Sequence, residues 1–357
     1  QRDDLSGVTS VAASPDGKHL YAAAFQTGNV VAFKRDQKTG KLTHVQSLTD
    51  PDSGALSSAV AVRLSTDGKR AAVASFSSET VSLLERDAET GTLKILDSIG
   101  GMDFVIEVAL APDGKNLYAG CSTSVEVLTV DDGGKLEATQ SVTGAAKPFT
   151  GVRCVKVSAD GDNVYAVSTY SNELLAFARD TETGKLRTLQ RISNADDEGG
   201  PSGLNGVHFV ACSPDGKHVY SVSGRFGGSD AITVFARDEG GRLSFLQELV
   251  AGEDDGPDRF EGGNEIEVSP DGMLVYAVAS TSDSIARFVR DRETGKLTFI
   301  SSVPVGVKAT PGSAGLCFSA VVHFCYVADE DATAVWGYRH KADCDREPDP
   351  RSLAPAS

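Results

Sequence analysis

The sequence predicts an all-β fold, a seven-bladed β-propeller of four-stranded antiparallel blades, from three observations. A turn of the type Ser-Pro-Asp-Gly recurs between short apolar runs at spacings of 46 to 56 residues. An Arg-Asp pair followed by Thr-Gly recurs with the same period. No long helical pattern competes with these runs. Four short strands repeated at this period are typical of propellers, in which each blade packs between its neighbours.

The first copy of the unit covers residues 7–48 and contains four expected strands. Apolar runs at 8–13, 20–23 and 30–33 are followed by a fourth run at 42–45. Pro15-Asp16-Gly17 separates the first two runs, and Thr39-Gly40 separates the last two. Proline presets φ, aspartate bonds to the local backbone and glycine accepts positive φ, so both breaks predict tight turns.

The first turn recurs along the chain, and a tyrosine follows most copies seven residues after the turn begins. Ala72 is the exception. We expect the tyrosines to pack between neighbouring blades, with each hydroxyl bonded locally. The turns begin at Ser14, Ser65, Ala111, Ser158, Ser213 and Ser269; the tyrosines are Tyr21, Tyr118, Tyr165, Tyr220, Tyr276 and, in a seventh copy without Asp-Gly, Tyr326.

An Arg-Asp pair closes the third strand of most units. A set of this kind suggests catalysis, but its regular place in successive copies favours a role in the solvation of the outer hairpins. The pairs lie at 35/36, 86/87, 179/180, 237/238 and 290/291, and Thr-Gly follows at 39/40, 90/91, 183/184 and 294/295.

The expected propeller is one domain over residues 1–340, followed by an irregular tail at 341–357 that is rich in proline and charge. The seventh copy lacks the hairpin that would supply a fourth strand, and an open strand edge is unfavourable. We therefore expect Gln1, Arg2 and Asp3 to complete this blade. The chain begins without methionine, which suggests removal of a signal peptide and favours secretion slightly, although the compartment stays open.

Composition excludes several classes of protein. Of the 357 residues, 40% are hydrophobic and 24% charged, which is typical of a globular protein. No run approaches the length of a membrane span. The formal net charge of −16 opposes binding to nucleic acid. The six cysteines lack metal-ligand spacing, so we expect them to be mostly free, buried thiols, with Cys344 in the polar tail as the exception.

The repeated motifs resemble those of a known family. Phe/Leu-x-Arg-Asp-x-x-Thr-Gly-x-Leu on the outer hairpin and Ser-Pro-Asp-Gly-Lys-x-x-Tyr on the inner one are similar to the lactonase-type seven-bladed β-propellers. This group includes bacterial 6-phosphogluconolactonase and fungal carboxymuconate-lactonizing enzyme. The resemblance extends from about residue 6 to residue 338 and implies the propeller fold and activity on a lactone.

Candidate site residues come from equivalent positions in the units, five residues before each inner turn, where the first strands should reach the channel mouth. Polar side chains are concentrated in units four to six. The positions hold Thr9, Val60, Ile106, Arg153, His208, Asn264 and Ala314; one residue deeper lie Ser10, Ala61, Glu107, Cys154, Phe209, Glu265 and Gly315.

Opening a lactone requires an attacking water, a group that accepts its proton, and donors for the charge that develops on the carbonyl oxygen. His208 or Glu265 is the candidate catalytic base, and Arg153 with Asn264 would bind a carboxylated substrate. The alternative is structural: Arg63, Glu107, Arg153 and Lys156 would form an ion-pair network between sheets. For His208, the alternative is a hydrogen-bonded structural role.

The resemblance implies only part of the family's site. The family pattern Pro-Arg-His aligns with residues 152–154, so Arg153 matches while the proline and histidine do not. The family's Asn-Glu motif aligns with Ser168-Thr169, so neither residue matches. The family's Ala-Asp-Ile-His motif aligns with residues 264–267, where Glu267 replaces the histidine. The phosphogluconate-type substrate is therefore not implied.

No organic cofactor is expected, because dinucleotide and P-loop motifs are absent. Two acidic loops on the mouth side, at 194–199 and 253–258, offer carboxylates for calcium. The alternative is that these acidic loops are solvated and bind no metal ion.

Two function classes follow. The first is a lactonase-like hydrolase, or a lactonizing enzyme running in reverse, on a small carboxylated lactone; the match at Arg153 favours it. The second is a non-catalytic propeller that presents its mouth-side loops to a protein partner, which the regular repeats and the missing family residues favour.

Overall fold

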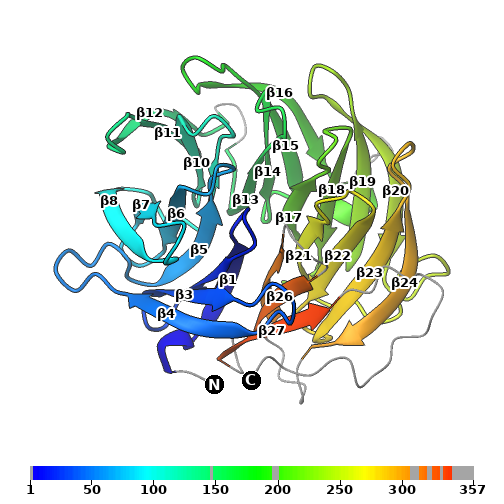
Figure 1. The fold of residues 1–357 in the computed structure, drawn as a ribbon. Coiled ribbons are helices and arrows are strands. Elements are labelled where there is room, and N and C mark those ends of the chain that lie inside the picture. The colour runs from blue at the N-terminus through cyan, green and yellow to red at the C-terminus, as the bar shows by residue number, and fades with distance from the viewer. Residues whose placement is uncertain are drawn as a thin grey trace.

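The computed structural model describes residues 3–144, 148–194, 201–305, 313–319, 324–329 and 333–339. These residues form seven antiparallel sheets arranged in a ring (Figure 1), which confirms the predicted propeller. Six sheets have four strands and the seventh has three within the described residues. The two 3-10 helices, η1 (Asp3–Leu5) and η2 (Ser202–Leu204), are the helices of the described chain, and neither is long and apolar enough to cross a membrane.

The strands follow the chain blade by blade, with the first strand of each blade nearest the centre of the ring. The first three blades are β1 (Val8–Ala13), β2 (His19–Ala24), β3 (Asn29–Arg35), β4 (Leu42–Leu48); β5 (Ala59–Leu64), β6 (Arg70–Ser75), β7 (Thr80–Arg86), β8 (Leu93–Ile99); and β9 (Glu107–Leu110), β10 (Asn116–Gly120), β11 (Val125–Val130), β12 (Leu136–Val142).

The remaining four blades are β13 (Val152–Val157), β14 (Asn163–Ser168), β15 (Glu173–Arg179), β16 (Leu186–Ser193); β17 (Val207–Cys212), β18 (His218–Ser223), β19 (Ala231–Arg237), β20 (Leu243–Val250); β21 (Gly263–Val268), β22 (Leu274–Ala279), β23 (Ser284–Arg290), β24 (Leu297–Pro304); and β25 (Ser313–Phe318), β26 (Phe324–Asp329), β27 (Ala334–Arg339).

The Ser-Pro-Asp-Gly turn joins the first two strands of blade one in a specific geometry. The backbone N–H of His19 donates to Ser14 Oγ at 2.9 Å, and Ser14 Oγ donates to Asp16 Oδ1 at 2.5 Å. Gly17 has φ of 68°, a conformation that favours glycine. The serine and aspartate thus fix the turn, which explains why both recur.

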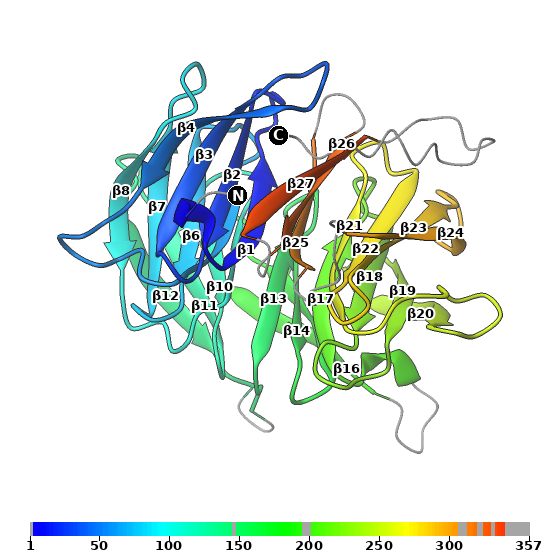
Figure 2. The same ribbon diagram turned by 90° about the horizontal axis from the view of Figure 1, so that it is seen from below.

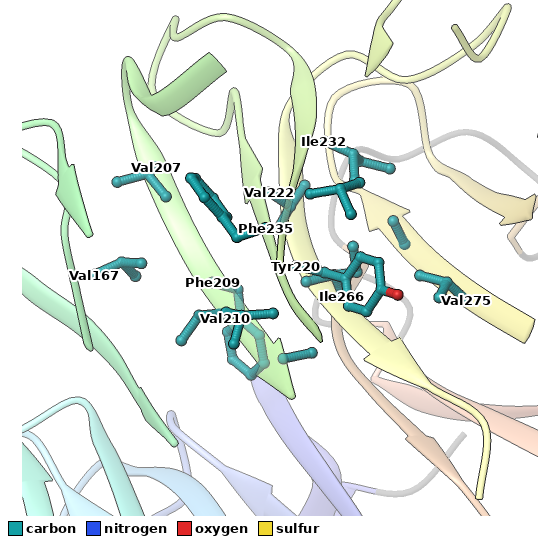
Figure 3. Packing of buried hydrophobic residues seen from close by; sticks show 14 of the residues in the cluster. Val167, Val207, Phe209, Val210, Tyr220, Val222, Ile232, Phe235, Ile266 and Val275 are labelled. Carbon is teal, nitrogen blue, oxygen red and sulfur yellow. The ribbon is translucent and has the colours of Figure 1, made fainter. Parts of the chain in front are cut away.

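Apolar side chains from adjacent sheets fill the spaces between blades. In the contact of blades five and six, Tyr220, Val222, Ile266 and Val275 belong to one cluster of buried residues (Figure 3). The six predicted tyrosines are all buried, with exposed fractions of 0 to 3%, so their predicted packing role is confirmed. This burial holds the ring together because each sheet covers an apolar face of the next.

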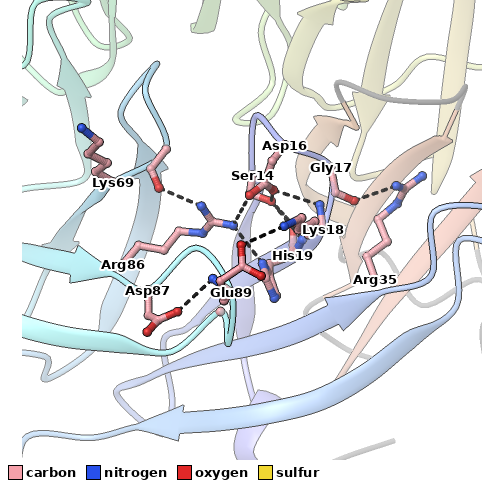
Figure 4. Close-up of polar contacts among 12 residues, drawn as sticks. Ser14, Asp16, Gly17, Lys18, His19, Arg35, Lys69, Arg86, Asp87 and Glu89 are labelled. Carbon is pink, nitrogen blue, oxygen red and sulfur yellow. Dashed lines mark hydrogen bonds and ion pairs between the residues drawn. The ribbon is translucent and has the colours of Figure 1, made fainter.

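Each repeated arginine reaches the neighbouring blade, and this corrects the expectation of hairpin solvation. Arg86 is 5% exposed, and its Nε donates to the hydroxyl of Tyr21 at 2.7 Å. Its Nη2 lies 2.8 Å from both Asp16 Oδ2 and His19 Nδ1 (Figure 4). We call this set an Arg-Tyr latch. The sequence could not reveal it, because partners about 70 residues apart look like separate hairpin residues.

The latch recurs at five of the blade contacts, always with the arginine on the later blade in ring order. Where Ala72 replaces the tyrosine, Val130 replaces the arginine of the next blade, so both halves are missing from one contact. The pairs are Arg86–Tyr21, Arg179–Tyr118, Arg237–Tyr165, Arg290–Tyr220 and, across the ring closure, Arg35–Tyr326.

The ring closes where blade one meets blade seven (Figure 2). Leu5, Val8, Phe324 and Tyr326 share one buried cluster across this contact. The expectation that the N-terminus completes blade seven is wrong for Asp3, because residues 3–5 form η1, whose Asp4 carbonyl accepts a hydrogen bond from Asn29 of blade one. Gln1, Arg2 and the predicted tail at 341–357 lie outside the described residues.

Candidate functional site at the mouth of the ring

Bulges in the first strands place the predicted site residues. The strand pairing shifts by one residue at Arg153 in β13, at His208 in β17 and at Asn264 in β21. A bulge inserts one unpaired residue and redirects its side chain. The loops after β14 and β18 lie on the same face as these bulges, which we call the mouth face: Tyr170 N–H donates to Thr150 O, just before β13, and Gly224 N–H to Gly206 O, just before β17.

Arg153 lies between two aromatic rings on this face. Its Nη2 donates to the Tyr170 hydroxyl at 3.0 Å, and its guanidinium carbon is 5.7 Å from the centre of that ring. The same carbon is 5.3 Å from the ring of Phe226. Tyr170 and Phe226 are 60% and 52% exposed, so the arginine is held at the surface by stacking.

His208 adjoins the same aromatic ring. Its imidazole is 8% exposed and lies edge-on to Phe226, with ring centres 5.5 Å apart. Burial lowers the pKa of His208 well below its usual value, and the nearby Arg225 and Arg153 lower it further. Its Nδ1 has no hydrogen-bond partner among the described residues. The imidazole is therefore neutral at pH 7.

Asn264 is joined to the group through a residue that the sequence analysis did not select. Arg225 Nη1 donates to Asn264 Oδ1 at 2.6 Å, and the Arg225 guanidinium carbon is 5.8 Å from the Phe226 ring. The structure thus brings Arg153, His208 and Asn264 together around Phe226. We call these four residues with Arg225 the mouth cluster.

Glu265 belongs to a deeper layer. Its Oε2 accepts a hydrogen bond from Leu316 N–H at 2.8 Å, and its Oε1 is 3.5 Å from Arg63 Nη2. Burial raises the pKa of Glu265 to about 8, although Arg63 acts in the opposite direction. The prediction that all four selected residues converge on one cluster therefore fails for Glu265.

Charged pairs join the first strands of different blades at the depth of Glu265. Arg63 Nη2 is 2.5 Å from Glu107 Oε2, and Lys156 Nζ is 2.7 Å from Glu267 Oε1. The structural alternative, in which charged residues of the first strands form an ion-pair network between sheets, is thus correct for Arg63 with Glu107. Arg153, which that alternative included, stacks on aromatic rings of the mouth cluster instead.

Arg225, Phe226 and Tyr170 were missed because they occupy loops between second and third strands, outside the positions that were compared. The segment Gly224-Arg225-Phe226-Gly227 could have signalled them. An arginine and an aromatic residue between glycines on a mouth-side loop are unusual for a solvated turn.

The described residues contain no group of three or more histidine, cysteine or acidic side chains placed to hold a metal ion. The loop at 253–258 is among them, whereas 195–199 of the other acidic loop lie outside the described chain. Five cysteines are described and unpaired; burial raises the pKa of Cys121 to about 12, so this thiol stays protonated.

Comparison with known proteins agrees with the fold and the repeated motifs. Residues 8–310 and 239–342 match the family described as "Lactonase, 7-bladed beta-propeller". A 6-phosphogluconolactonase of Formosa agariphila is 26% identical over 83% of this chain and 84% of its own length. One from Bacillus subtilis is 30% identical over 48% and 47% of the two chains.

Solved structures show the same ring. A putative 6-phosphogluconolactonase of Bacteroides uniformis has a TM-score of 0.72 at 18% identity and covers 98% of this chain and 97% of its own. The periplasmic gluconolactonase of Pseudomonas aeruginosa has a TM-score of 0.70 at 18% identity, with 89% of each chain covered. A hydrazine synthase chain of Kuenenia stuttgartiensis scores 0.68 at 19% identity, covering 96% and 98%, so the ring alone does not define the chemistry.

The family match, together with the ring of sheets, defines the class of protein, a lactone hydrolase built on a propeller. The chain belongs to the lactonase family of seven-bladed β-propellers.

Proposed function

We propose that the mouth cluster hydrolyses a small lactone that carries a carboxylate. The observation that carries this proposal is the position of a neutral, buried His208 beside two guanidinium groups, those of Arg153 and Arg225. A base and two cations around one exposed aromatic ring supply the groups that lactone opening requires.

Each residue has a role in the proposed reaction. Arg153 binds the carboxylate of the substrate, and Asn264 with Arg225 faces the lactone carbonyl. The neutral imidazole of His208 accepts a proton from water as the water oxygen bonds to the carbonyl carbon. The ring C–O bond then breaks, and the imidazolium returns the proton to the leaving oxygen, which gives a hydroxy acid.

Glu265 is a weaker candidate for the base. A carboxyl group with a pKa of about 8 is mostly protonated at pH 7 and cannot accept a proton. One of its oxygens also binds the backbone N–H of Leu316. We therefore assign the proton transfer to His208 and a supporting, structural role to Glu265.

The relatives named 6-phosphogluconolactonase suggest a second anionic group, phosphate, as the part of the substrate that Arg153 would bind. A panel of lactones with a carboxylate, with a phosphate and without an anion distinguishes these choices. For the preferred lactone, Arg153→Ala should raise KM at least tenfold and leave kcat within about threefold, since the arginine binds ground state and transition state alike.

Arg187→Ala is the matched control, because Arg187 is exposed at the start of β16, beside the outer hairpin and at the opposite end of the strand from the mouth-side loop. It should leave both constants unchanged. Binding of carboxylated lactones without turnover by the wild type would favour the non-catalytic binding module instead.

A further inference from the structure

Three aromatic rings form a continuous row on the mouth face, over blades one to three. The centre of the Phe25 ring lies 6.0 Å from that of Phe76, which lies 5.2 Å from that of Phe104. Phe25 follows β2, Phe76 follows β6 and Phe104 precedes β9. Phe76 N–H donates to Ser58 O, just before β5, in the pattern that defines the mouth face. At the end of the row, Phe104 is 47% exposed, which leaves a large part of an apolar side chain in water.

Phe104 also has a backbone conformation that suits glycine. Its φ is 47°, in the left-handed region, which is unfavourable for a bulky side chain. The equivalent position, two residues before each candidate site position, has positive φ in all six blades whose residue there is described. It holds Gly7, Ser58, Phe104, Gly151, Gly206 and Gly262. An exposed ring held in an unfavourable conformation, where most blades have glycine, indicates a functional role for Phe104.

The row ends one blade away from Arg153. Ser122 N–H donates to Asp103 O at 2.8 Å, and Gly151 N–H donates to Ser122 O at 2.6 Å. Backbone contacts thus join the Phe104 loop to the start of β13, the strand that carries Arg153. Because packed sheets lie about 10 Å apart, equivalent positions on adjacent blades are separated by about this distance. A small ligand can therefore reach both the Phe104 ring and the Arg153 guanidinium.

Charge restricts the kind of group that the Phe104 ring can bind. The loops that hold the end of the row, at 76–79 and 100–106, contain two acidic residues and no lysine or arginine. These carboxylates disfavour an anion at the ring. The guanidinium groups of Arg153 and Arg225, on the next two blades, disfavour a cation. An uncharged apolar group fits both conditions, and an aromatic ring can in addition pack edge-to-face or offset on phenylalanine.

We propose that Phe104, with Phe76 behind it, binds an uncharged aryl group of the substrate. The substrate class is then a lactone that carries an anionic group and an aromatic ring. Arg153 holds the anion, and in this respect the assignment rests on the proposed function. Phe104 is a specificity-determining residue, since it selects the aryl group and takes no part in the proton transfer at His208.

The test compares the binding of 4-phenylbutyrate and butyrate to the full chain by ligand-observed NMR titration. Neither probe contains a lactone, so the measurement does not depend on turnover. The wild type should bind 4-phenylbutyrate about tenfold more tightly than butyrate, because the phenyl ring is removed from water against the aromatic row. Phe104→Gly should lose this preference and bind butyrate as the wild type does. Phe104→Tyr, which keeps an aromatic ring, should retain the preference.

Phe104→Gly is expected to fold, because glycine has the same backbone conformation at the equivalent position of other blades. Phe245→Ala is the matched control, since Phe245 is 51% exposed but lies on the outer strand β20. It should keep the preference for 4-phenylbutyrate. A packing role for Phe104 would instead give Phe104→Gly a lower melting temperature and an unchanged preference, and this result would overturn the proposal.

Equal affinity of the wild type for the two probes would overturn it as well. The outcomes separate the aryl site from the proposed reaction. A preference that depends on Phe104, in a protein that hydrolyses no lactone of the panel, would support the aryl site and contradict the proposed function alone. Hydrolysis of carboxylated lactones without any preference for the phenyl probe would contradict the aryl site alone.

Discussion

At the scale of single residues, burial has opposite effects on the two candidate bases. It lowers the pKa of His208 and raises the pKa of Glu265, so both side chains favour their neutral forms at pH 7. A neutral imidazole can accept a proton, whereas a neutral carboxyl group cannot. Two residues at nearly equivalent positions of adjacent blades are thus suited to different tasks.

The pKa of Glu265 predicts a pH dependence of stability. Between the ordinary glutamate pKa of 4.5 and the folded-state value of about 8, the folded chain binds more protons than the unfolded chain. The contribution of Glu265 to stability is therefore full below pH 4.5 and is lost as pH rises toward 8, by at most about 1.4 kcal/mol per pH unit.

Glu265→Gln should remove this slope while it keeps the amide oxygen available to Leu316. The measurement is the free energy of unfolding in urea at pH 5, 6.5 and 8 for both proteins. Histidine titration affects both equally, so the difference between them isolates Glu265. Parallel curves would show that Glu265 is ionised in the folded chain.

At the scale of structural elements, the latches convert two short motifs into contacts between blades. Tyr220 illustrates this, because its hydroxyl donates to Gly295 O at 3.0 Å and accepts from Arg290 Nε at 2.7 Å, both on the next blade. The turn motif of one blade and the hairpin motif of the next are therefore one interaction.

Truncation of such a tyrosine should be costly. Tyr220→Ala should lower the free energy of unfolding by about 3–5 kcal/mol, because it leaves a cavity and removes an acceptor from a buried arginine. Tyr170→Ala, at an exposed tyrosine, should change it by less than about 0.5 kcal/mol. Chemical denaturation of both variants makes the comparison, and equal effects would argue against the packing role.

Two latches contain histidine and two contain asparagine at the position of His19, which predicts acid sensitivity at the first two. Burial, and then the adjacent arginine, lowers the pKa of His19 and of His218. Stability from these histidines is present above the unfolded pKa of about 6.5 and is lost as pH falls toward their folded values.

The double variant His19→Asn with His218→Asn copies the latches of Asn116 and Asn163. It should keep its melting temperature at pH 7.5 and lose less than the wild type between pH 6.5 and 5. Identical melting temperatures of the two proteins across this range would mean that the histidines titrate normally.

At the scale of the whole molecule, sequence periodicity predicted the ring because each blade repeats the same turns, and turn residues act locally. Bulge positions at 153, 208 and 264 could be found by counting from those turns. The grouping around Phe226 could not, because loop length differs between blades. The N-terminal expectation failed at Asp3, since pairing at a strand edge depends on tertiary contacts that no local pattern encodes.

The most direct test of the central claim is the rate of lactone opening by His208→Ala, measured with the preferred lactone of the panel, with and without added imidazole. Loss of a positioned base should lower kcat by about 10²–10⁴, and imidazole should restore part of it. His44→Ala, on the outer strand β4, should retain full activity. Wild-type turnover by a folded His208→Ala protein would contradict the proposed reaction at the mouth cluster.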